Sequence, residues 1–283
     1  MTAGWEAQRV SGELRARMAD GTYPLRSTLP SQRDLATEFG VSRDTVQRAL
    51  RELVDEGWIA SRQGSGSRVI KTQRIHSSAA KATRLRRGAT LGPFISEAFE
   101  QPEVTLDVYT LTSESLDVHI RLQVERIRAG SITPQRIALR MLLPDESLVM
   151  PYPRARDDKD DPRLRDRLRD ISRRHTESIQ TVLKDLATEE LVRSVDVEVR
   201  HTPLTPTFKL YLLNGVEALH GMYEVIERPM TLETGEVINA LDVLGLGATL
   251  THHVKDGAPD SAGSVFVESM RTWFDSVWNL FSA

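Results

Sequence analysis

Two helical segments joined by only two residues are the feature that most constrains what this chain can fold into. The first segment starts after Ser31, which has Asp34 three residues later in the manner of a capping box, and it stops at Gly40. The second starts at Ser42, and its apolar face is Val46, Ala49, Leu50 and Leu53. A connection as short as Gly40-Val41 disfavours antiparallel packing and suits the crossed pair of a helix-turn-helix.

The flanking residues extend this pair into a larger unit. Upstream, Val10, Leu14 and Met18 recur every four residues and predict a helix that ends at Asp20-Gly21. Downstream, two short strands are predicted at 58–61 and 68–70, on either side of a turn rich in Gly and Ser. The first 72 residues are therefore expected to form a winged helix-turn-helix.

Charge divides the chain in the same way. Residues 1–87 carry a net charge of +7 and residues 88–283 a net charge of −10, which together give the overall −3. Lysine and arginine concentrated in one module are typical of a surface that binds a polyanion, because they displace counterions from phosphates. The chain has no cysteine, which excludes disulfides, thiolate zinc sites and cysteine nucleophiles.

Several motifs, in order, resemble the DNA-binding domain of GntR-family transcriptional regulators over about residues 5–70. The residues that carry the resemblance are Leu29-Pro30-Ser31-Gln32-Arg33-Asp34-Leu35-Ala36, Gly40-Val41-Ser42-Arg43-Asp44-Thr45-Val46, Ala49-Leu50, Leu53, Glu56-Gly57 and Gln63-Gly64-Ser65-Gly66. The resemblance implies that the second helix of the turn enters the major groove by its N-terminal end, and that the wing reaches the minor groove.

The resemblance also assigns DNA contacts to individual residues. Arg33 and Arg43 are expected to contact phosphates and guanine, and Ser42 and Thr45 to bond to the DNA backbone or base edges. Gln63 and Gly64 belong to the wing, where Gly64 would let the backbone approach the sugar-phosphate edge. Where the family commonly has arginine after Thr-Val, this chain has Gln47, which favours adenine.

The remainder of the chain predicts a linker at 73–88 and a second domain at 89–283. Alternating patterns indicate strands at 104–110, 136–143 and 195–200 with helices at 115–129 and 161–191 between them. Strands at 208–213, 219–227 and 237–244 and a helix at 265–281 follow. The expected fold class is α+β, an N-terminal winged helix-turn-helix plus a C-terminal mixed α/β sandwich that senses a ligand. The aromatic face of the last helix is expected to pack on its own sheet or across a dimer.

Two known types of domain are considered for the second domain, and only one of them on the basis of a motif. Its α/β composition is compatible with the chorismate-lyase-like ligand domain. Its segment Thr207-x-Lys209-x4-Asn214-x6-Gly221-Met222 resembles a degenerate phospholipase D-like motif, in which histidine, aspartate and serine are replaced. Without the histidine nucleophile the site is expected to be catalytically inactive. Thr207, Lys209 and Asn214 are then expected to bind an anionic effector.

An enzyme remains the alternative, because His253, Lys255 and Asp260 match the undegraded spacing of that motif. Their chemistry would be that of a phosphodiesterase. We expect instead a non-enzymatic regulator, a ligand-responsive dimeric repressor that binds an inverted-repeat operator in double-stranded DNA and needs no cofactor. No apolar run is long enough to cross a bilayer, and residues 1–10 lack the apolar core of a signal peptide, so a cytoplasmic location is expected.

Overall fold

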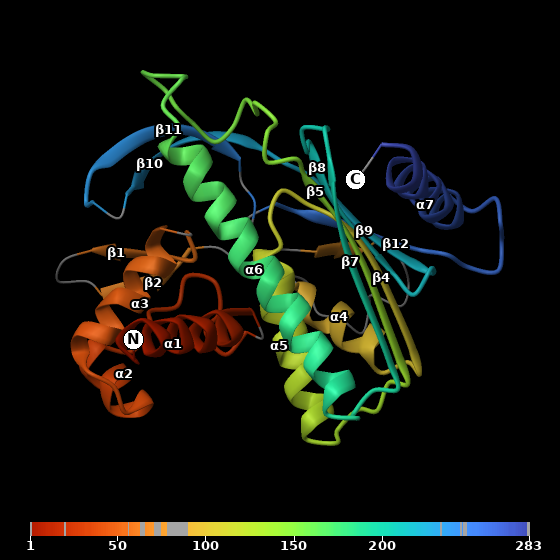
Figure 1. Cartoon of the computed structure of the whole chain (residues 1–283), viewed down its shortest axis with the longest axis horizontal. Coiled ribbons are helices and arrows are strands. Elements are labelled where there is room, and N and C mark those ends of the chain that lie inside the picture. The colour runs from red at the N-terminus through yellow and green to blue at the C-terminus, as the bar shows by residue number, and fades with distance from the viewer. Residues whose placement is uncertain are drawn as a thin grey trace. The chain divides into compact units, whose positions relative to one another are not determined.

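In this computed structural model the described residues are 2–19, 21–55, 57–62, 66–70, 75–77, 90–232, 234–243, 245 and 248–281. They form two compact units (Figure 1). The first comprises Met1–Gln73 with Pro229–Ile238, and the second comprises Arg74–Arg228 with Asn239–Ala283. The first unit is mainly helical, whereas the second is built on a seven-stranded sheet.

The N-terminal part of the first unit is a winged helix-turn-helix. Its elements are α1 (Thr2–Ala19), α2 (Gln32–Phe39), α3 (Arg43–Asp55), β1 (Ile59–Arg62) and β2 (Gly66–Val69). The strands β1 and β2 pair antiparallel. The apolar positions that predicted the helices are buried at the centre of this unit: Val10, Leu14, Met18, Leu35, Val46, Ala49, Leu50 and Leu53.

The ends of α2 and α3 confirm the predicted turn. The Ser31 hydroxyl accepts a hydrogen bond from the backbone N–H of Asp34 at 3.2 Å and caps α2. Gly40 ends α2 in the left-handed region, with φ 64°, where glycine carries no steric penalty. The Ser42 hydroxyl accepts the N–H of Thr45 at 3.1 Å at the start of α3. Two caps and one glycine therefore fix the crossing of the two helices.

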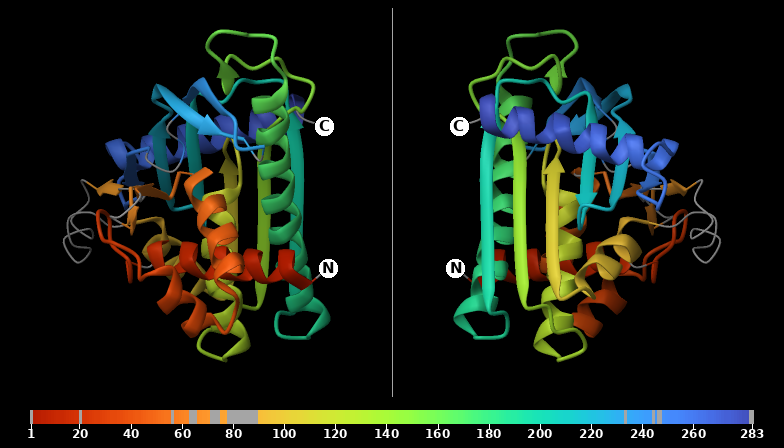
Figure 2. Two further views of the ribbon diagram at one scale, coloured as in Figure 1. Left: turned by 90° about the vertical axis from the view of Figure 1, so that its left-hand side faces the viewer. Right: turned by 90° about the vertical axis from the view of Figure 1, so that its right-hand side faces the viewer.

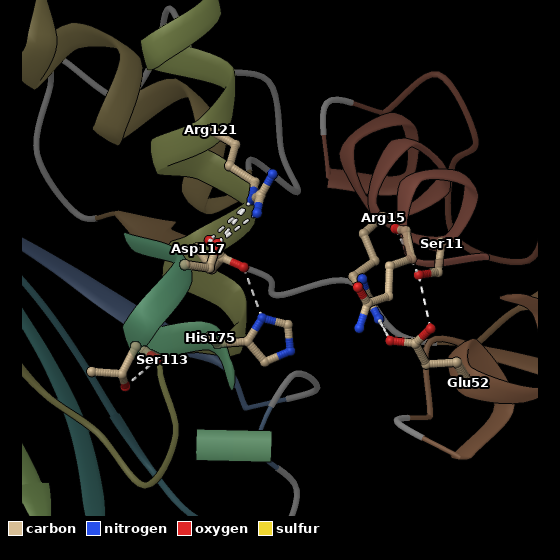
Figure 3. A network of polar contacts seen from close by, with 10 residues as sticks. Ser11, Arg15, Glu52, Ser113, Asp117, Arg121 and His175 are labelled. Atoms are coloured by element: carbon tan, nitrogen blue, oxygen red, sulfur yellow. Dashed lines mark hydrogen bonds and ion pairs between the residues drawn. The ribbon is translucent and has the colours of Figure 1, made fainter. Parts of the chain in front are cut away.

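A polar clamp that the sequence pattern did not predict joins α1 to α3. Glu52 accepts hydrogen bonds from the Ser11 hydroxyl at 2.9 Å and from the Arg15 guanidinium at 2.7 Å (Figure 3). Arg15 is 5% exposed. The Arg15 guanidinium is therefore buried within this unit. Its ion pair with Glu52 holds α1 against α3.

The second unit contains a mixed sheet with the strand order β3-β12-β9-β8-β4-β5-β7. Its strands are β3 (Ile75–Ser77), β4 (Glu103–Tyr109), β5 (Arg136–Pro144), β7 (Ser194–Thr202), β8 (Phe208–Leu213), β9 (Glu217–Met222) and β12 (Leu250–Val254). β4, β5 and β7 are parallel, as expected for consecutive β-α-β units, whereas β8 pairs antiparallel with β4. A smaller sheet has the order β10-β11-β6, with β6 (Arg154–Ala155), β10 (Val225–Thr231) and β11 (Val237–Val243).

Helices cover both faces of the large sheet. α4 (Leu91–Phe99), α5 (Glu114–Arg128) and α6 (Arg163–Thr188) pack on one face, over a core of mainly aliphatic side chains that also includes Phe94, Phe99 and Tyr211. α7 (Ala262–Leu280) crosses the other face, as Figure 2 shows in blue. Phe274 and Trp278 of α7 pack there with Tyr109 and Leu210 of the sheet. Of the two arrangements expected for the aromatic helix, the structure shows packing on its own sheet.

The structure corrects three details of the predicted elements. The single strand expected at 219–227 is two strands, β9 and β10, because the chain turns at Tyr223-Glu224. α4 and β12 were not predicted. Within the expected linker, residues 75–77 form β3, which pairs parallel with β12, and residues 73, 74 and 78–88 lie outside the described residues.

Candidate DNA interface and ligand site

The N-terminal end of α3 and the start of α2 present exposed polar side chains. Arg43 and Gln47 are exposed and lie four residues apart, so they share one face of α3. Arg33 is exposed in the first turn of α2. The first N–H groups of a helix attract anions, so Arg43 adds a cation where α3 is already polarised positive. These exposed guanidinium and amide groups are of the types that can hydrogen-bond to base edges and to phosphates.

The other residues expected at the DNA divide into two groups. Ser42 is exposed, but its hydroxyl caps α3 and lies 2.9 Å from the Thr45 hydroxyl. Thr45 is 2% exposed, so its side chain is part of the interior of the turn. Both side chains therefore have contacts within the fold. Motif spacing alone could not distinguish this structural role from a role in binding DNA. Gln63 and Gly64 lie outside the described residues.

The second unit collects a lysine and a tyrosine at the carboxyl ends of its parallel strands. Lys209, near the start of β8, is 3% exposed and pairs in register with Gly221 of β9. Its ammonium lies 5.9 Å from the centroid of the Tyr223 ring. In open α/β sheets, ligands bind at this edge, where the strand order changes direction. β4 is such a strand, with parallel β5 on one side and antiparallel β8 on the other.

Tyr223 connects Lys209 to the loop that leads into α5. Its hydroxyl accepts the N–H of Leu111 at 2.8 Å and lies 3.1 Å from the Thr110 hydroxyl. Burial raises the pKa of Tyr223 far above its ordinary value, so the phenol keeps its proton. Because the Thr110 hydroxyl donates to Thr112 O at 2.8 Å, Tyr223 is the donor in its contact with Thr110. Tyr223 therefore contacts the loop before α5 through its hydroxyl and Lys209 through its ring. Sequence reasoning missed Tyr223 because nothing in its spacing points to this contact.

The structure does not bring the three expected effector residues together. Thr207 is exposed and immediately precedes β8, close to Lys209 in the chain. Asn214 follows the other end of β8, where its side chain accepts the N–H of Thr105 at 2.8 Å and donates to Ala98 O at 3.1 Å. Asn214 therefore shapes the turn, with φ 50°, and is not next to the ammonium of Lys209.

A buried polar cluster locks α5 against α6. Asp117 accepts a hydrogen bond from the Ser178 hydroxyl at 2.6 Å and lies 2.8 Å from the Nδ1 of His175 (Figure 3). Arg121 approaches the same carboxylate at 3.3 Å. Asp117 and Glu114 are the acidic residues of the first turn of α5, and these contacts occupy the Asp117 carboxylate. The cluster fixes the position of the helix end beside Tyr223.

His253, Lys255 and Asp260, the residues of the alternative phosphodiesterase site, have different surroundings. His253 stacks on Phe266 at 3.8 Å between ring centroids, and its Nε2 lies 3.0 Å from the Thr251 hydroxyl. Lys255 forms an ion pair with Glu268 of α7. Asp260 is exposed in the turn before α7. The geometry does not favour a phosphodiesterase at these three residues.

The part of the chain that the structure describes contains no group of three or more His, Cys, Asp or Glu side chains placed to hold a metal ion. Among the helices of the same residues, none is both long and apolar enough to cross a membrane.

Comparison with known proteins places the N-terminal residues in a family. The family model for bacterial regulatory proteins of the gntR family matches residues 6–69. The Exu regulon transcriptional regulator of Escherichia coli is 36% identical over 87 residues, which are 31% of this chain and 33% of that protein. The mannosyl-D-glycerate transport/metabolism system repressor MngR of Escherichia coli is 41% identical over 69 residues, 24% of this chain and 28% of that protein.

Each of these matches covers about a third of this chain or less. An uncharacterized HTH-type transcriptional regulator of Rhizobium meliloti is 31% identical over 81 residues, 29% of this chain and 33% of that protein. The matches thus span about a third or less of these relatives. A solved structure of the AraR DNA-binding domain in complex with an operator is 31% identical and covers 23% of this chain and 77% of that chain, with a TM-score of 0.22. The residues that match the gntR-family model, 6–69, are those that fold as the winged helix-turn-helix in this structure.

Proposed function

We propose that this chain is a sequence-specific DNA-binding transcriptional regulator, a dimeric repressor that responds to a small anionic molecule. Residues 1–72 would bind the operator, and residues 89–283 would bind the effector and form the dimer. Residues 73–88 would connect these two domains. The observation that carries the proposal is the gntR-family match over residues 6–69, with Arg33, Arg43 and Gln47 exposed on the helices of the turn. Exposed arginine and glutamine at a recognition helix are the residue types that read guanine and adenine.

The relatives support a repressor linked to small molecules. MngR is named as the repressor of a mannosyl-D-glycerate transport and metabolism system, and another relative is named for the Exu regulon. The first name links a repressor to the transport and metabolism of a small molecule, and the second links a regulator to a regulon. One winged module buries little DNA surface, so two copies on an inverted repeat would supply the affinity.

The ligand site proposed for the second unit is the carboxyl edge of its parallel strands at Lys209. The buried ammonium of Lys209 supplies the donor for a phosphate or a carboxylate. The degenerate phospholipase D-like resemblance fits this proposal, because the lysine and the glycine of that motif, Lys209 and Gly221, are cross-strand partners here. With Thr207 in place of the histidine, the site would bind and not cleave.

A binding-site selection from random double-stranded DNA tests the proposal. We expect enrichment of a short inverted repeat whose half-sites lie one helical turn, or a multiple of it, apart. The same selection with Arg33→Ala/Arg43→Ala is the matched control and should lose the enrichment. A selection that enriches no sequence with the intact protein would refute sequence-specific binding.

A further inference from the structure

β7 is the last strand of the large sheet and is nine residues long. Among the described residues its sheet neighbour is β5 alone. The backbone N–H and C=O groups on the other edge of β7 point away from the sheet and are able to pair with another strand. An edge of this length is a template for strand addition unless its side chains oppose it.

The hydrophobic core reaches the surface along this edge. The core between the sheet and α4, α5 and α6 consists of buried side chains, with four partly buried ones packed against it. All four lie on β7 or on the neighbouring helix α6: Val182, Val195, Val197 and Val199. The incompletely covered part of the core is therefore the part that a strand added to β7 would cover.

The other face of β7 carries charges of both signs. Asp196 and Glu198 are exposed, and Arg200 is partly buried over the ring of Trp278, 4.4 Å from its centroid. Charged side chains protect an edge strand from pairing with a second copy only if they repel the same side chains of that copy. Under a two-fold axis through Glu198, however, Asp196 of each copy faces Arg200 of the other, and Val197 faces Val199. Glu198 faces its own copy, which is a repulsive contact, and lies diagonal to both Asp196 and Arg200 of the other copy, whose effects offset each other. The two attractive Asp196–Arg200 pairs outnumber the one Glu198–Glu198 contact, so the pattern favours a second copy.

We propose that the partner of this edge is a second copy of the chain, bound by antiparallel pairing of the two β7 strands about this axis. The two sheets would become one continuous sheet, with the valines of both copies covered on the side of α6. The inference rests on the proposed dimeric regulator and names its interface. It also explains why the exposed side chains of a nine-residue edge strand are complementary and not of one sign.

Charge reversal tests the interface with variants that repel themselves and attract each other. Asp196→Arg/Glu198→Arg makes this face of β7 entirely basic, and Arg200→Glu makes it entirely acidic. Each variant alone should raise the dimer dissociation constant at least about tenfold, because attractive cross-strand pairs become repulsive twice by symmetry. An equimolar mixture should restore dimers, measured by light scattering after size-exclusion chromatography and by native mass spectrometry of isotope-labelled chains.

The controls separate the interface from the fold and from the proposed function. Asp157→Arg/Asp160→Arg reverses two exposed carboxylates elsewhere in the second unit and should leave the dimer unchanged. Circular dichroism of each variant reports folding, and the mixture excludes simple damage, since a structural loss of the Arg200 contact with Trp278 would not be repaired by a partner. Intact dimers in both reversed variants would overturn the β7 interface and leave the dimeric regulator standing. A wild-type chain that stays monomeric at tens of micromolar would overturn both.

Discussion

Arg43 lies in the first turn of α3, one turn before Gln47, and under the proposed function it reads a base. A bidentate contact to guanine is worth about 1–3 kcal/mol of discrimination. Arg43→Ala should therefore weaken binding to the selected operator by about this amount and relax the preference at one position of each half-site. Competition binding across single-base operator variants, at one fixed salt concentration, measures both effects.

Arg51, two turns after Arg43 on α3, is the matched control. It is also exposed, but it lies away from the N-terminal end of the helix. Arg51→Ala should weaken all operators equally, because a phosphate contact carries no sequence information. If Arg43→Ala also weakens every operator by the same factor, Arg43 binds phosphate and does not read a base.

Close packing around Gly221 leaves no room for a side chain at this position. A Cβ at this position would lie 2.4 Å from the carbonyl oxygen of Thr249 and 2.6 Å from the side chain of Leu250. Because a backbone atom cannot yield cheaply, Gly221→Ala should lower the free energy of unfolding by about 1–3 kcal/mol. Gly257→Ala, where nothing lies within 4 Å of the added carbon, is the control and should change it little. Urea unfolding gives both values, and equal stabilities would contradict the close approach.

At the level of single residues, the sequence singled out Lys209, but it did not predict which side chains lie close to Lys209 in the fold. The motif spacing predicted Lys209 and Asn214 in one anion site, but a strand advances about 3.3 Å per residue, so the two lie about 16 Å apart along β8. Asn214 is instead committed to the backbone of the turn. Tyr223, which does approach Lys209, comes from the segment after β9, and only the completed sheet brings it there.

At the level of elements, local signals predicted those helices whose ends carry them. Ser31, Gly40 and Ser42 set the boundaries of α2 and α3, and the structure confirms them. α4 was missed because Gly92 and Pro93 interrupt its apolar pattern, although proline is tolerated in the first turn of a helix. Among the described residues β3 pairs with β12 alone, and β12 pairs with β3 and β9, so each strand is defined by partners that are distant in the chain and no local pattern predicts it.

The docking of α7 on the sheet is expected to weaken in acid. His220 of β9 and His253 of β12 lie against Phe266 of α7. Burial lowers the pKa of both side chains, and each also feels a neighbouring histidine: His253 acts on His220, and His252 acts on His253. The unfolded chain therefore takes up protons near the ordinary histidine pKa of about 6.5, whereas the folded chain resists them, so the free energy of unfolding falls as pH drops below that value.

Thermal unfolding between pH 7.5 and 5 measures this effect. The double variant His220→Gln/His253→Gln should lose stability less steeply with falling pH than the wild type. His119, whose pKa burial lowers to about 4, and the pair of His252 with Glu217 are common to both proteins and cancel in the comparison. The Lys255–Glu268 pair beside them is also unchanged. Parallel pH profiles would show that these two histidines do not control the stability of the second unit.

At the level of the whole molecule, charge and pattern separated the two parts of the chain because each part has its own composition. The basic residues 1–87 precede the acidic remainder, and the main division by contacts falls after Gln73. The pattern did not predict that Pro229–Ile238, from the hairpin of β10 and β11, would group with the N-terminal residues. Such a grouping arises from tertiary contacts, which periodicity does not encode.

Under the proposed function, the ligand site and the operator site affect each other's affinity. If an anion binds beside Lys209, its binding energy must differ between the states that bind DNA well and poorly, and typical couplings are about 1–3 kcal/mol. We expect inorganic phosphate, a sugar monophosphate or a carboxylated sugar to change operator affinity by about 5- to 150-fold. Lys209→Met keeps the volume of the buried chain but removes its charge, so it should abolish this response and leave operator binding in the absence of the anion intact.

Lys255→Met removes an exposed lysine that pairs with Glu268, and it should keep the response of the wild type. Fluorescence anisotropy of the labelled operator, titrated with each anion, measures the coupling in all three proteins. A Lys209→Met protein that responds like the wild type would place the anion elsewhere, whereas a wild type that binds operator but ignores all three anions would contradict an anion sensor while leaving the DNA-binding regulator intact. By linkage the operator must change the affinity for the anion by the same factor, so a titration of the anion against the free and the DNA-bound protein provides an independent check of the same coupling.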